Sequence, residues 1–339
     1  MTVKSKEEMH PFVKYPGGKS KEIPLVLQYL PNRIDRYVEP FVGGGSIFFA
    51  MNIKKSYIND KSKDLYNFYS LIQKQDKKLK GYLVKIDNMW HELSKNEIEN
   101  ISISIKELSK DALLSHYASA KAKKSKTISS FNENGKTISD EDIKKIEITA
   151  RKTAFYMLIR DLYNQKQDST QLHSACFYFL REYCYSSMFR FSSKGDFNVP
   201  YGGMSYNEKY MKCKIDYMFS DKMKEYLAET TIENKDFQDF MNDVALNEND
   251  FVFLDPPYDS DFSTYDNNPF DKKEQERLCD CLKKTRAKWM LIIKKTDFIY
   301  NLYKDFNVLE YDVNYLVSFK NRNDRATTHL LITNYNIIE

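Results

Sequence analysis

The stretch RYVEPFVGGGS, residues 36–46, indicates the fold class of this chain. Its first four residues are predicted to form a short β-strand, the three glycines a tight turn, and residues 47–51 the start of a helix. A strand, a glycine-rich turn and a helix make up the nucleotide-binding half of a doubly wound α/β fold. A second predicted strand, residues 57–59, runs into Asp60, about 20 residues downstream, where such folds hold ribose hydroxyls. A tight loop without a ligand is the alternative for the glycines alone, and the position of Asp60 favours a nucleoside-bearing cofactor.

A second informative stretch begins with the apolar residues 251–254 and continues as Asp255, Pro256, Pro257 and Tyr258. It predicts a buried strand that ends in a rigid turn, because neither proline can donate a backbone hydrogen bond and each fixes its own φ. The Asp255 carboxylate and the Pro256 carbonyl are left as acceptors, with the ring of Tyr258 beside them. Such a group suits a flat heteroaromatic amine, which offers N–H donors and a ring face. A turn whose acid serves only as a cap is the alternative for this stretch alone.

The third stretch is KYPGGK, residues 14–19, followed by a helical pattern through residues 23–30. Two glycines at the start of a helix permit close approach of a ligand to the backbone, and Lys19 adds a cation there. The spacing does not match that of an ATP-binding P-loop, which excludes that class of site.

The composition narrows the class of protein further. The chain has 339 residues, with 52 Lys and Arg against 48 Asp and Glu, which neither requires nor excludes nucleic acid. Five cysteines, without a Cys-x-x-Cys spacing, predict reduced thiols and no zinc site. No apolar run is long enough to span a bilayer. We therefore expect a soluble, cytoplasmic protein of the prokaryotic or phage type, with one large or two modest domains.

In this order, the three motifs resemble those of the Dam-like (D12 class) DNA adenine-N6 methyltransferases. The resemblance covers most of the chain and is poor near residues 95–135. It implies S-adenosyl-L-methionine as cofactor and an α/β fold with a Rossmann-like, seven-stranded methyltransferase sheet and an inserted, mainly helical target-recognition domain. Tyr15 stands where a Trp is common, and Pro16 where a small residue is common. The implied cofactor-binding residues are Tyr15, Lys19, Glu39, Phe41, Gly43, Gly45, Asp60, Asp236, Phe237 and Asp255.

The resemblance also implies a mechanism, with Asp255, Pro256 and Tyr258 as catalytic residues. Asp255 and the Pro256 carbonyl would accept the two N–H bonds of adenine N6, and Tyr258 would stack on the flipped base. The methyl donor is a sulfonium, so no metal is expected. The expected function is site-specific methylation of adenine in duplex DNA for host modification, with a restriction endonuclease of the same specificity as a possible partner. The alternatives are an RNA adenine methyltransferase and a non-catalytic DNA-binding module.

Further predictions concern the middle of the chain. Residues 118–134 are rich in Lys and Ser and are predicted to form a mobile basic loop. Residues 193–196 are predicted to form a hairpin turn in the target-recognition region, where an aromatic core is the alternative to DNA contact. Ser186 and Ser187 stand where GATC-methylating members have Asn-Gly, which argues against GATC as the target. The expected DNA-binding residues are Tyr185, Arg190, Lys194, Asn198, Pro200 and Arg322.

The expected organisation has three parts: residues 1–75 begin the catalytic domain, residues 76–215 form the inserted target-recognition region, and residues 216–339 complete the catalytic domain. Asp236 is expected either to accept the cofactor's adenine amino group, with Phe237 packed on the ring, or to cap a helix. A helix is predicted at 271–284 and a buried strand at 288–293. Two closing strands, near 308–315 and 329–334, are expected to form a hairpin at the sheet edge.

Overall fold

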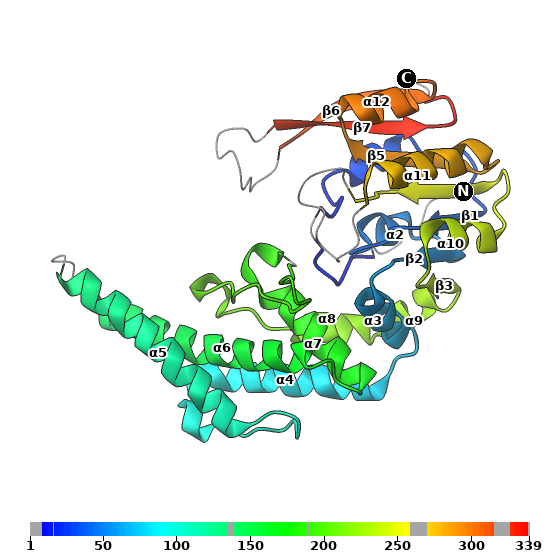
Figure 1. The fold of residues 1–339 in the computed structure, drawn as a ribbon. Helices are drawn as coiled ribbons and strands as arrows, with labels where there is room; N and C mark the ends of the chain where they lie inside the picture. Colours follow the sequence, from blue (N-terminus) through cyan, green and yellow to red (C-terminus); the bar gives the residue numbers. More distant parts are fainter. Residues whose placement is uncertain are drawn as a thin grey trace, which may run out of the picture. The chain divides into compact units, whose positions relative to one another are not determined.

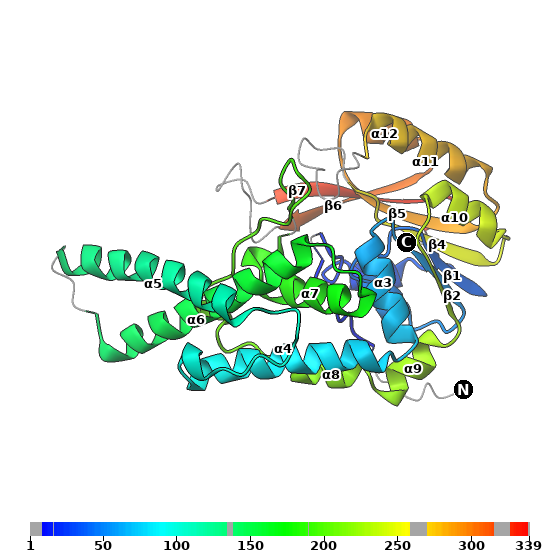
Figure 2. The same ribbon diagram turned by 60° about the horizontal axis from the view of Figure 1, so that its bottom comes forward.

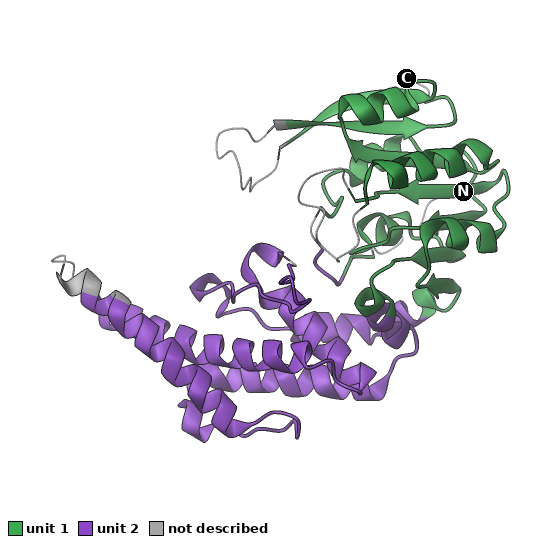
Figure 3. Cartoon of the chain, in the orientation of Figure 1, with its two compact units in different colours: residues 1–11, 17–66, 225–339 green, residues 12–16, 67–224 purple. Residues whose placement is uncertain are grey.

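A computed structural model describes residues 9–15, 17–133, 138–188, 190–257, 270–314 and 326–337. Pro16, Tyr258 and Arg322 therefore lie outside the described residues. The chain divides into two compact units (Figure 3). Unit 1 comprises residues 1–11, 17–66 and 225–339, and unit 2 comprises residues 12–16 and 67–224. The expected domain boundaries remain a prediction.

In the described part of unit 1, seven strands form one sheet in the order β3-β2-β1-β4-β5-β7-β6 (Figure 1). The first five strands in this order are parallel, and β7 runs antiparallel to both β5 and β6. The mixed α/β fold, the seven-stranded sheet and the closing hairpin at its edge confirm the sequence prediction. The strands are β1 Arg36–Glu39, β2 Ser56–Asn59, β3 Thr230–Glu233, β4 Asp250–Leu254, β5 Lys288–Lys294, β6 Asn307–Asn314 and β7 Ala326–Thr333.

Both faces of the central strands are covered, as expected for parallel strands joined by helices. All five residues of β4 are buried. On β1, side chains alternate: Val38 joins a core formed with α10, α11 and α12, whereas Tyr37 packs against Phe48 on α2. The helices of this unit are α1 Ile23–Gln28, α2 Ser46–Met51, α10 Phe237–Val244, α11 Lys272–Lys284 and α12 Asp297–Tyr303, and α3 Lys63–Gln73 and α9 Asp221–Leu227 run from one unit into the other.

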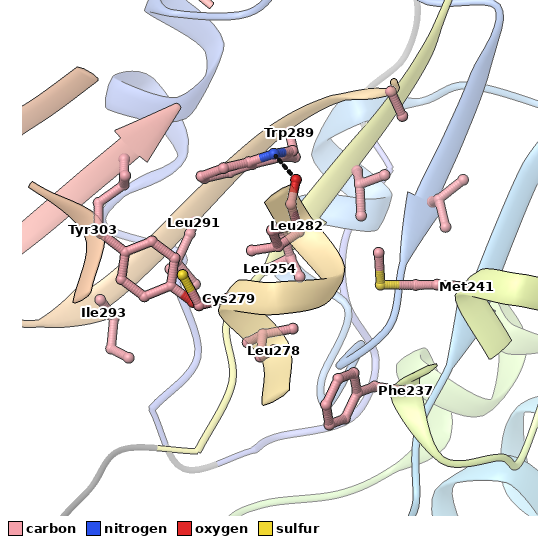
Figure 4. Close-up of a cluster of buried hydrophobic side chains, with 14 of the residues drawn as sticks. Phe237, Met241, Leu254, Leu278, Cys279, Leu282, Trp289, Leu291, Ile293 and Tyr303 are labelled. Carbon is pink, nitrogen blue, oxygen red and sulfur yellow. Dashed lines mark hydrogen bonds between the residues drawn. The ribbon is translucent and has the colours of Figure 1, made fainter. Parts of the chain in front are cut away.

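The core between the sheet and α10, α11 and α12 holds α11 in place (Figure 4). Leu278 and Cys279 are completely buried against β4 and β5. Trp289 on β5 donates its indole N–H to the Leu282 carbonyl at 3.2 Å, which ties the end of the helix to the sheet. The placement of α11 matters for the site, because two of its other side chains form hydrogen bonds to the turn that follows β4 and to the turn that precedes α10.

Unit 2 is mainly helical. Its longest helices pack around an aromatic core that contains Trp90, Phe155 and Phe179, and Trp90 donates its indole N–H to the Lys209 carbonyl at 3.0 Å. Aromatic rings provide a large buried area per residue, so a helical unit of this size can form a stable core. The helices that belong to it alone are α4 Lys77–Lys95, α5 Lys110–Glu133, α6 Asp140–Asn164, α7 Thr170–Tyr183 and α8 Lys212–Met218.

The predicted mobile loop at residues 118–134 is wrong over its described part, because α5 continues as a helix to Glu133. Ala and Lys have high intrinsic helix propensity, and residues 118–124 contain three of each. Helix α5 also lies alongside α6, in the views of Figure 1 and Figure 2 alike, and Ala120 is buried. At the start of α6 the Ser139 hydroxyl accepts the Asp142 backbone N–H at 3.1 Å, which caps the helix.

Candidate active site

Three acidic side chains follow neighbouring strands at their carboxyl ends. Glu39 ends β1, Asp60 follows β2 directly and Asp255 follows β4 directly. These strands are parallel neighbours with β1 in the middle, so their carboxyl ends lie at one edge of the sheet. The chain leaves β1 toward β2 and later returns to β4 on the other side of β1. Ligands of open α/β sheets bind at this kind of topological switch point.

The Asp60 carboxylate is held by two backbone N–H groups. Its Oδ2 accepts from Gly43 at 2.9 Å, and its Oδ1 accepts from Ser62 at 2.8 Å. Gly43 and Gly45 have φ values of 49° and 74°, a left-handed conformation that suits glycine. Burial raises the pKa of Asp60 to about 6, although the two N–H bonds favour its charged form. The glycine turn and the predicted ribose acid are therefore brought together.

The Asp255 carboxylate forms an ion pair with Lys19. Lys19 Nζ lies 2.7 Å from Asp255 Oδ1 and also donates to the Gly17 carbonyl at 3.1 Å. The Lys19 side chain is only 3% exposed, whereas that of Asp255 is 22% exposed and can meet a ligand. Burial raises the pKa of Asp255, and Lys19 opposes that shift. Two motifs separated by more than 230 residues thus meet at the end of β4.

Glu39 lies below this edge and is 3% exposed. Its Oε2 accepts the Tyr37 hydroxyl at 2.7 Å. Burial raises the pKa of Glu39, and the negative charges of Asp255 and Asp60 raise it further, although Tyr37 favours the charged form. The charges of Asp60 and Asp255 therefore both act on the buried Glu39.

Comparison with known proteins identifies the family of this chain. The model of the D12 class N6 adenine-specific DNA methyltransferases matches residues 15–317. The chain belongs to this family. It is an N6-adenine DNA methyltransferase, as predicted from its motifs.

Relatives with type II names match the chain over nearly its whole length. The chain is 29% identical to the type II methyltransferase M.CviBI of Paramecium bursaria Chlorella virus NC1A, over 96% of this chain and 100% of that protein. It is 26% identical to M1.LlaDCHI of Lactococcus lactis subsp. cremoris, over 98% of each chain. It is 28% identical to M.MjaIII of Methanocaldococcus jannaschii, over 97% of this chain and 100% of that protein.

Asp236 of the methyltransferase caps α10, which confirms the helix-cap alternative. Its Oδ1 accepts the Gln238 backbone N–H at 3.0 Å, and its carboxylate pairs with Arg277 on α11 at 2.7 Å. The Phe237 ring is 4% exposed and lies under the Arg277 guanidinium, 4.1 Å from its centroid. Phe41 packs on Phe237 with 5.5 Å between ring centroids. The cofactor contacts of Asp236, Phe237 and Phe41 remain predictions.

Two functional candidates were missed from the sequence, and both lie on α11. Gln275 is completely buried and donates to the Pro257 carbonyl at 3.0 Å, and Arg277 holds Asp236. The sequence shows a helix there but contains no signal for these partners, which lie 18 and 41 residues away along the chain. Both contacts depend on how α11 packs on the sheet.

Tyr15 belongs to unit 2, and so does the rest of the strap formed by residues 12–16. Arg181 on α7 donates from Nε to the Lys14 carbonyl at 2.8 Å and lies over the Tyr15 ring, 5.2 Å from its centroid. Lys14 pairs with Glu182 at 3.1 Å. These contacts order the strap, while the contact of Tyr15 with the cofactor remains a prediction.

The predicted hairpin turn is present in unit 2. Phe191 and Phe197 form an antiparallel bridge, and Gly195 has a φ of 82°. Phe197 is buried, whereas Arg190 and Lys194 are exposed. The stretch therefore combines a core face with an exposed face, which confirms the aromatic-core alternative in part, whereas DNA contact remains a prediction.

Arg190 is oriented by a neighbour in this hairpin. Its Nε donates to Asn198 Oδ1 at 2.9 Å, so a neutral amide orients the guanidinium. Nearby, Tyr185 is 48% exposed and donates its backbone N–H to the Pro200 carbonyl at 2.9 Å. The DNA contacts of all these residues remain predictions.

Ser186 and Ser187 both adopt a left-handed backbone, with φ values of 51° and 53°. Asn and Gly tolerate that conformation at a lower energetic cost than serine does. The residues differ from the Asn-Gly of GATC-methylating members, and the backbone is one that Asn-Gly would also adopt.

Within the described residues, no helix has the length and apolar character needed to cross a membrane.

Proposed function

We propose that this methyltransferase moves a methyl group from S-adenosyl-L-methionine to N6 of an adenine within a specific duplex DNA sequence, as a host modification enzyme. The ion pair between Lys19 and Asp255 carries the proposal. It favours the charged form of the carboxylate, against the effect of burial, next to two prolines that have no N–H to compete for it. A carboxylate so placed is available to an amine donor.

The residues at the switch point fit the cofactor. Gly43 and Gly45 have no Cβ, so a ligand can approach their backbone closely. Asp60 uses one lone pair of each oxygen for Gly43 and Ser62, which leaves acceptors for ribose hydroxyls. When bound, S-adenosyl-L-methionine supplies an electrophilic methyl group on a sulfonium.

Asp255 and Pro256 would prepare adenine N6 for the transfer. Asp255 Oδ1 is taken by Lys19, so Oδ2 is the oxygen available to one N–H of the amine, and the Pro256 carbonyl would take the other. The nitrogen lone pair would then point out of the base plane toward the methyl group. The carboxylate also stabilises the positive charge that develops on N6. Tyr258 is the proposed stacking partner of the flipped base, which offsets part of the few kcal/mol lost on unstacking.

The proposed DNA contacts lie mostly in the hairpin of unit 2. Arg190 suits readout of guanine, because its fork matches the two acceptors of that base in the major groove. Lys194, at the turn, suits a phosphate contact. Tyr185, Asn198, Pro200 and Arg322 complete the proposed DNA-binding set. The type II names of the relatives support a restriction endonuclease of the same specificity as a partner, and the five free cysteines suit a reducing cytoplasm.

A labelled-methyl assay tests the proposal. The wild-type protein should transfer label from S-adenosyl-L-methionine to duplex DNA, and Asp255→Ala should not. Asp280→Ala is the matched control, because it removes an exposed carboxylate from α11. Both variants should bind duplex DNA as tightly as the wild type does, because phosphate contacts supply most of the affinity. Transfer at the wild-type rate by Asp255→Ala would refute the catalytic assignment, and methylation-sensitive sequencing would define the target.

A further inference from the structure

Arg277 on α11 uses every hydrogen-bond donor that an arginine has. A guanidinium carries five N–H groups. Nη1 donates to Asp236 Oδ1 at 2.7 Å and to Gln238 Oε1 at 3.0 Å, and Nη2 donates to Asp236 Oδ2 at 2.8 Å. Nε donates to Glu274 Oε1 at 3.3 Å, and the fifth N–H, on Nη2, contacts Glu274 Oε2. No donor is left for a ligand, so Arg277 can act on a ligand only through its neighbours.

The guanidinium is also fixed in orientation. It lies over the Phe237 ring, and Phe237 is itself buried against Phe41 and Phe270, with ring centroids 5.5 and 5.7 Å away. A planar cation on an aromatic face, with two carboxylates along its edges, has one favourable orientation. Asp236 is therefore held through both of its oxygens by a rigid partner.

Asp236 retains one free acceptor position. Its Oδ1 receives Arg277 and the Gln238 backbone N–H, while among the described residues the recorded donor to Oδ2 is Arg277 alone. A carboxylate has about four lone-pair sites, so one remains on Oδ2. The Asp236 side chain is 24% exposed, which leaves it accessible to a ligand.

The turn that carries Asp236 is joined to the predicted ribose site. Asn59 accepts the Lys235 backbone N–H at 2.8 Å and donates to the Lys235 carbonyl at 3.1 Å. Asn234 donates to the Asp60 carbonyl at 2.8 Å. A nucleoside whose ribose is bound by Asp60 would therefore have its base near Asp236.

We propose that Arg277 is a positioning residue, which holds Asp236 so that its remaining oxygen lone pair accepts the amino group of the cofactor's adenine and makes the site selective for a 6-aminopurine over a 6-oxopurine. The inference rests on the proposed use of S-adenosyl-L-methionine and adds a residue that determines cofactor specificity. A 6-oxopurine presents a carbonyl oxygen where adenine presents N–H, and that oxygen would face the carboxylate and be repelled.

Arg277 also keeps Asp236 ionised. Its hydrogen bonds lower the pKa of Asp236, with smaller contributions from the Gln238 N–H and from Lys61, whereas partial burial raises it. Glu274 is the other charged group that contacts Arg277 and offsets part of its charge. Loss of Arg277 should raise the pKa of Asp236, so that acceptance of the amino group fails at a higher pH than in the wild type.

The test compares two cofactor products that differ at one position. Calorimetry measures the dissociation constants of S-adenosyl-L-homocysteine and of S-inosyl-L-homocysteine, in which an oxo group replaces the amino group. The wild type should prefer the adenosyl compound by about tenfold to a hundredfold, the range for a hydrogen bond to a charged group. Arg277→Met should lose most of this preference. As the pH is lowered, its affinity for S-adenosyl-L-homocysteine should begin to fall nearer to neutral pH than that of the wild type. Lys272→Met is the control, because Lys272 also lies over a ring, that of Phe298, on the same helix.

A wild-type preference and an unshifted pH profile in Arg277→Met would overturn the inference. Arg277→Lys serves if the Met variant does not fold: an ammonium group cannot hold both carboxylate oxygens, so this variant should also lose the preference, and a wild-type ratio would again overturn the role. Failure of the proposed function looks different, because the wild type would then bind neither compound. Equal binding of both compounds by the wild type would refute the role of Asp236, and with it that of Arg277, while methyl transfer could still be measured.

Discussion

The side-chain amide of Gln275 donates to the carbonyl of Pro257 at 3.0 Å from within the core of unit 1. Pro256 and Pro257 have no N–H, so the turn after Asp255 lacks the backbone donors that usually stabilise a turn. Gln275 supplies a bond from another element to the Pro257 carbonyl, and the Pro256 carbonyl stays available for its proposed contact with the substrate amine. Helix α11 is thereby connected to the turn that carries Asp255.

Replacing Gln275 by Met, which has a similar shape but no donor, should weaken catalysis more than cofactor binding. We expect kcat to fall by up to about a hundredfold, because small displacements of reacting groups have effects of that size. The dissociation constant of S-adenosyl-L-homocysteine should change little. Gln28→Met, at an exposed position, is the control. Unchanged kcat in a folded Gln275→Met would show that the turn is held without the amide.

Lys19→Met should change the pH dependence of methyl transfer. In the proposed mechanism Asp255 stabilises charge on N6 in its ionised form; burial raises its pKa and Lys19 opposes that rise. Without Lys19 the pKa of Asp255 rises further, so activity should be lost at a higher pH as the solution is acidified. The pH profile of kcat/KM measures this shift, with Lys21→Met, an exposed neighbour, as the control. If kcat/KM of Lys19→Met falls at the same acidic pH as that of the wild type, Lys19 does not influence the ionisation of Asp255.

Asp60→Ala should weaken cofactor binding. Loss of a hydrogen bond to a charged group costs about 1.5–3 kcal/mol, which corresponds to roughly a tenfold to a hundredfold rise in the dissociation constant. In the wild type, the raised pKa of Asp60, about 6, predicts that affinity decreases as the pH falls through that value, because the protonated acid is the weaker acceptor. Calorimetry at several pH values tests both points. An Asp60→Ala variant that binds as the wild type does would place the ribose elsewhere.

Arg190→Ala and Lys194→Ala should affect DNA recognition in different ways. Loss of Arg190 should relax the preference at one guanine by about 1–3 kcal/mol, whereas loss of Lys194 should weaken all sequences alike and reduce the salt dependence. Asn198→Ala should resemble a weaker form of Arg190→Ala, because Asn198 orients the guanidinium. Methylation of a library with randomised sites measures all three. An unchanged profile for a folded Arg190→Ala would assign base readout to other residues.

Local sequence patterns predicted those elements whose buried residues and turn-forming residues follow one another directly in the sequence. The strand at residues 36–39, its glycine turn and the strand that leads into Asp255 are such cases. The helical course of residues 118–133 was missed because lysines and serines suggested a solvated loop, although Ala and Lys favour a helix and α6 provides a packing partner.

The sequence alone did not predict the contacts between residues that lie far apart along the chain. Motif resemblance assigned both Lys19 and Asp255 to the cofactor site, but it did not predict that the two side chains form an ion pair, and no spacing rule gives that geometry. Asp236 looked like a ligand contact or a helix cap, and nothing near it in the chain pointed to Arg277, which arrives from α11 because Leu278 and Cys279 are buried against the sheet. Such partners emerge from packing, which a single sequence does not specify.

The strap at residues 12–16 limits how unit 2 can be expressed as a separate fragment. Unit 2 is not one continuous piece of chain: its residues 67–224 are separated from the strap by a segment of unit 1. A fragment made of 67–224 alone would lack the Lys14 carbonyl, and Arg181, whose side chain is completely buried, would lose a hydrogen-bond acceptor. A separately expressed unit 2 therefore needs the strap joined to residue 67 by a new linker that replaces residues 17–66.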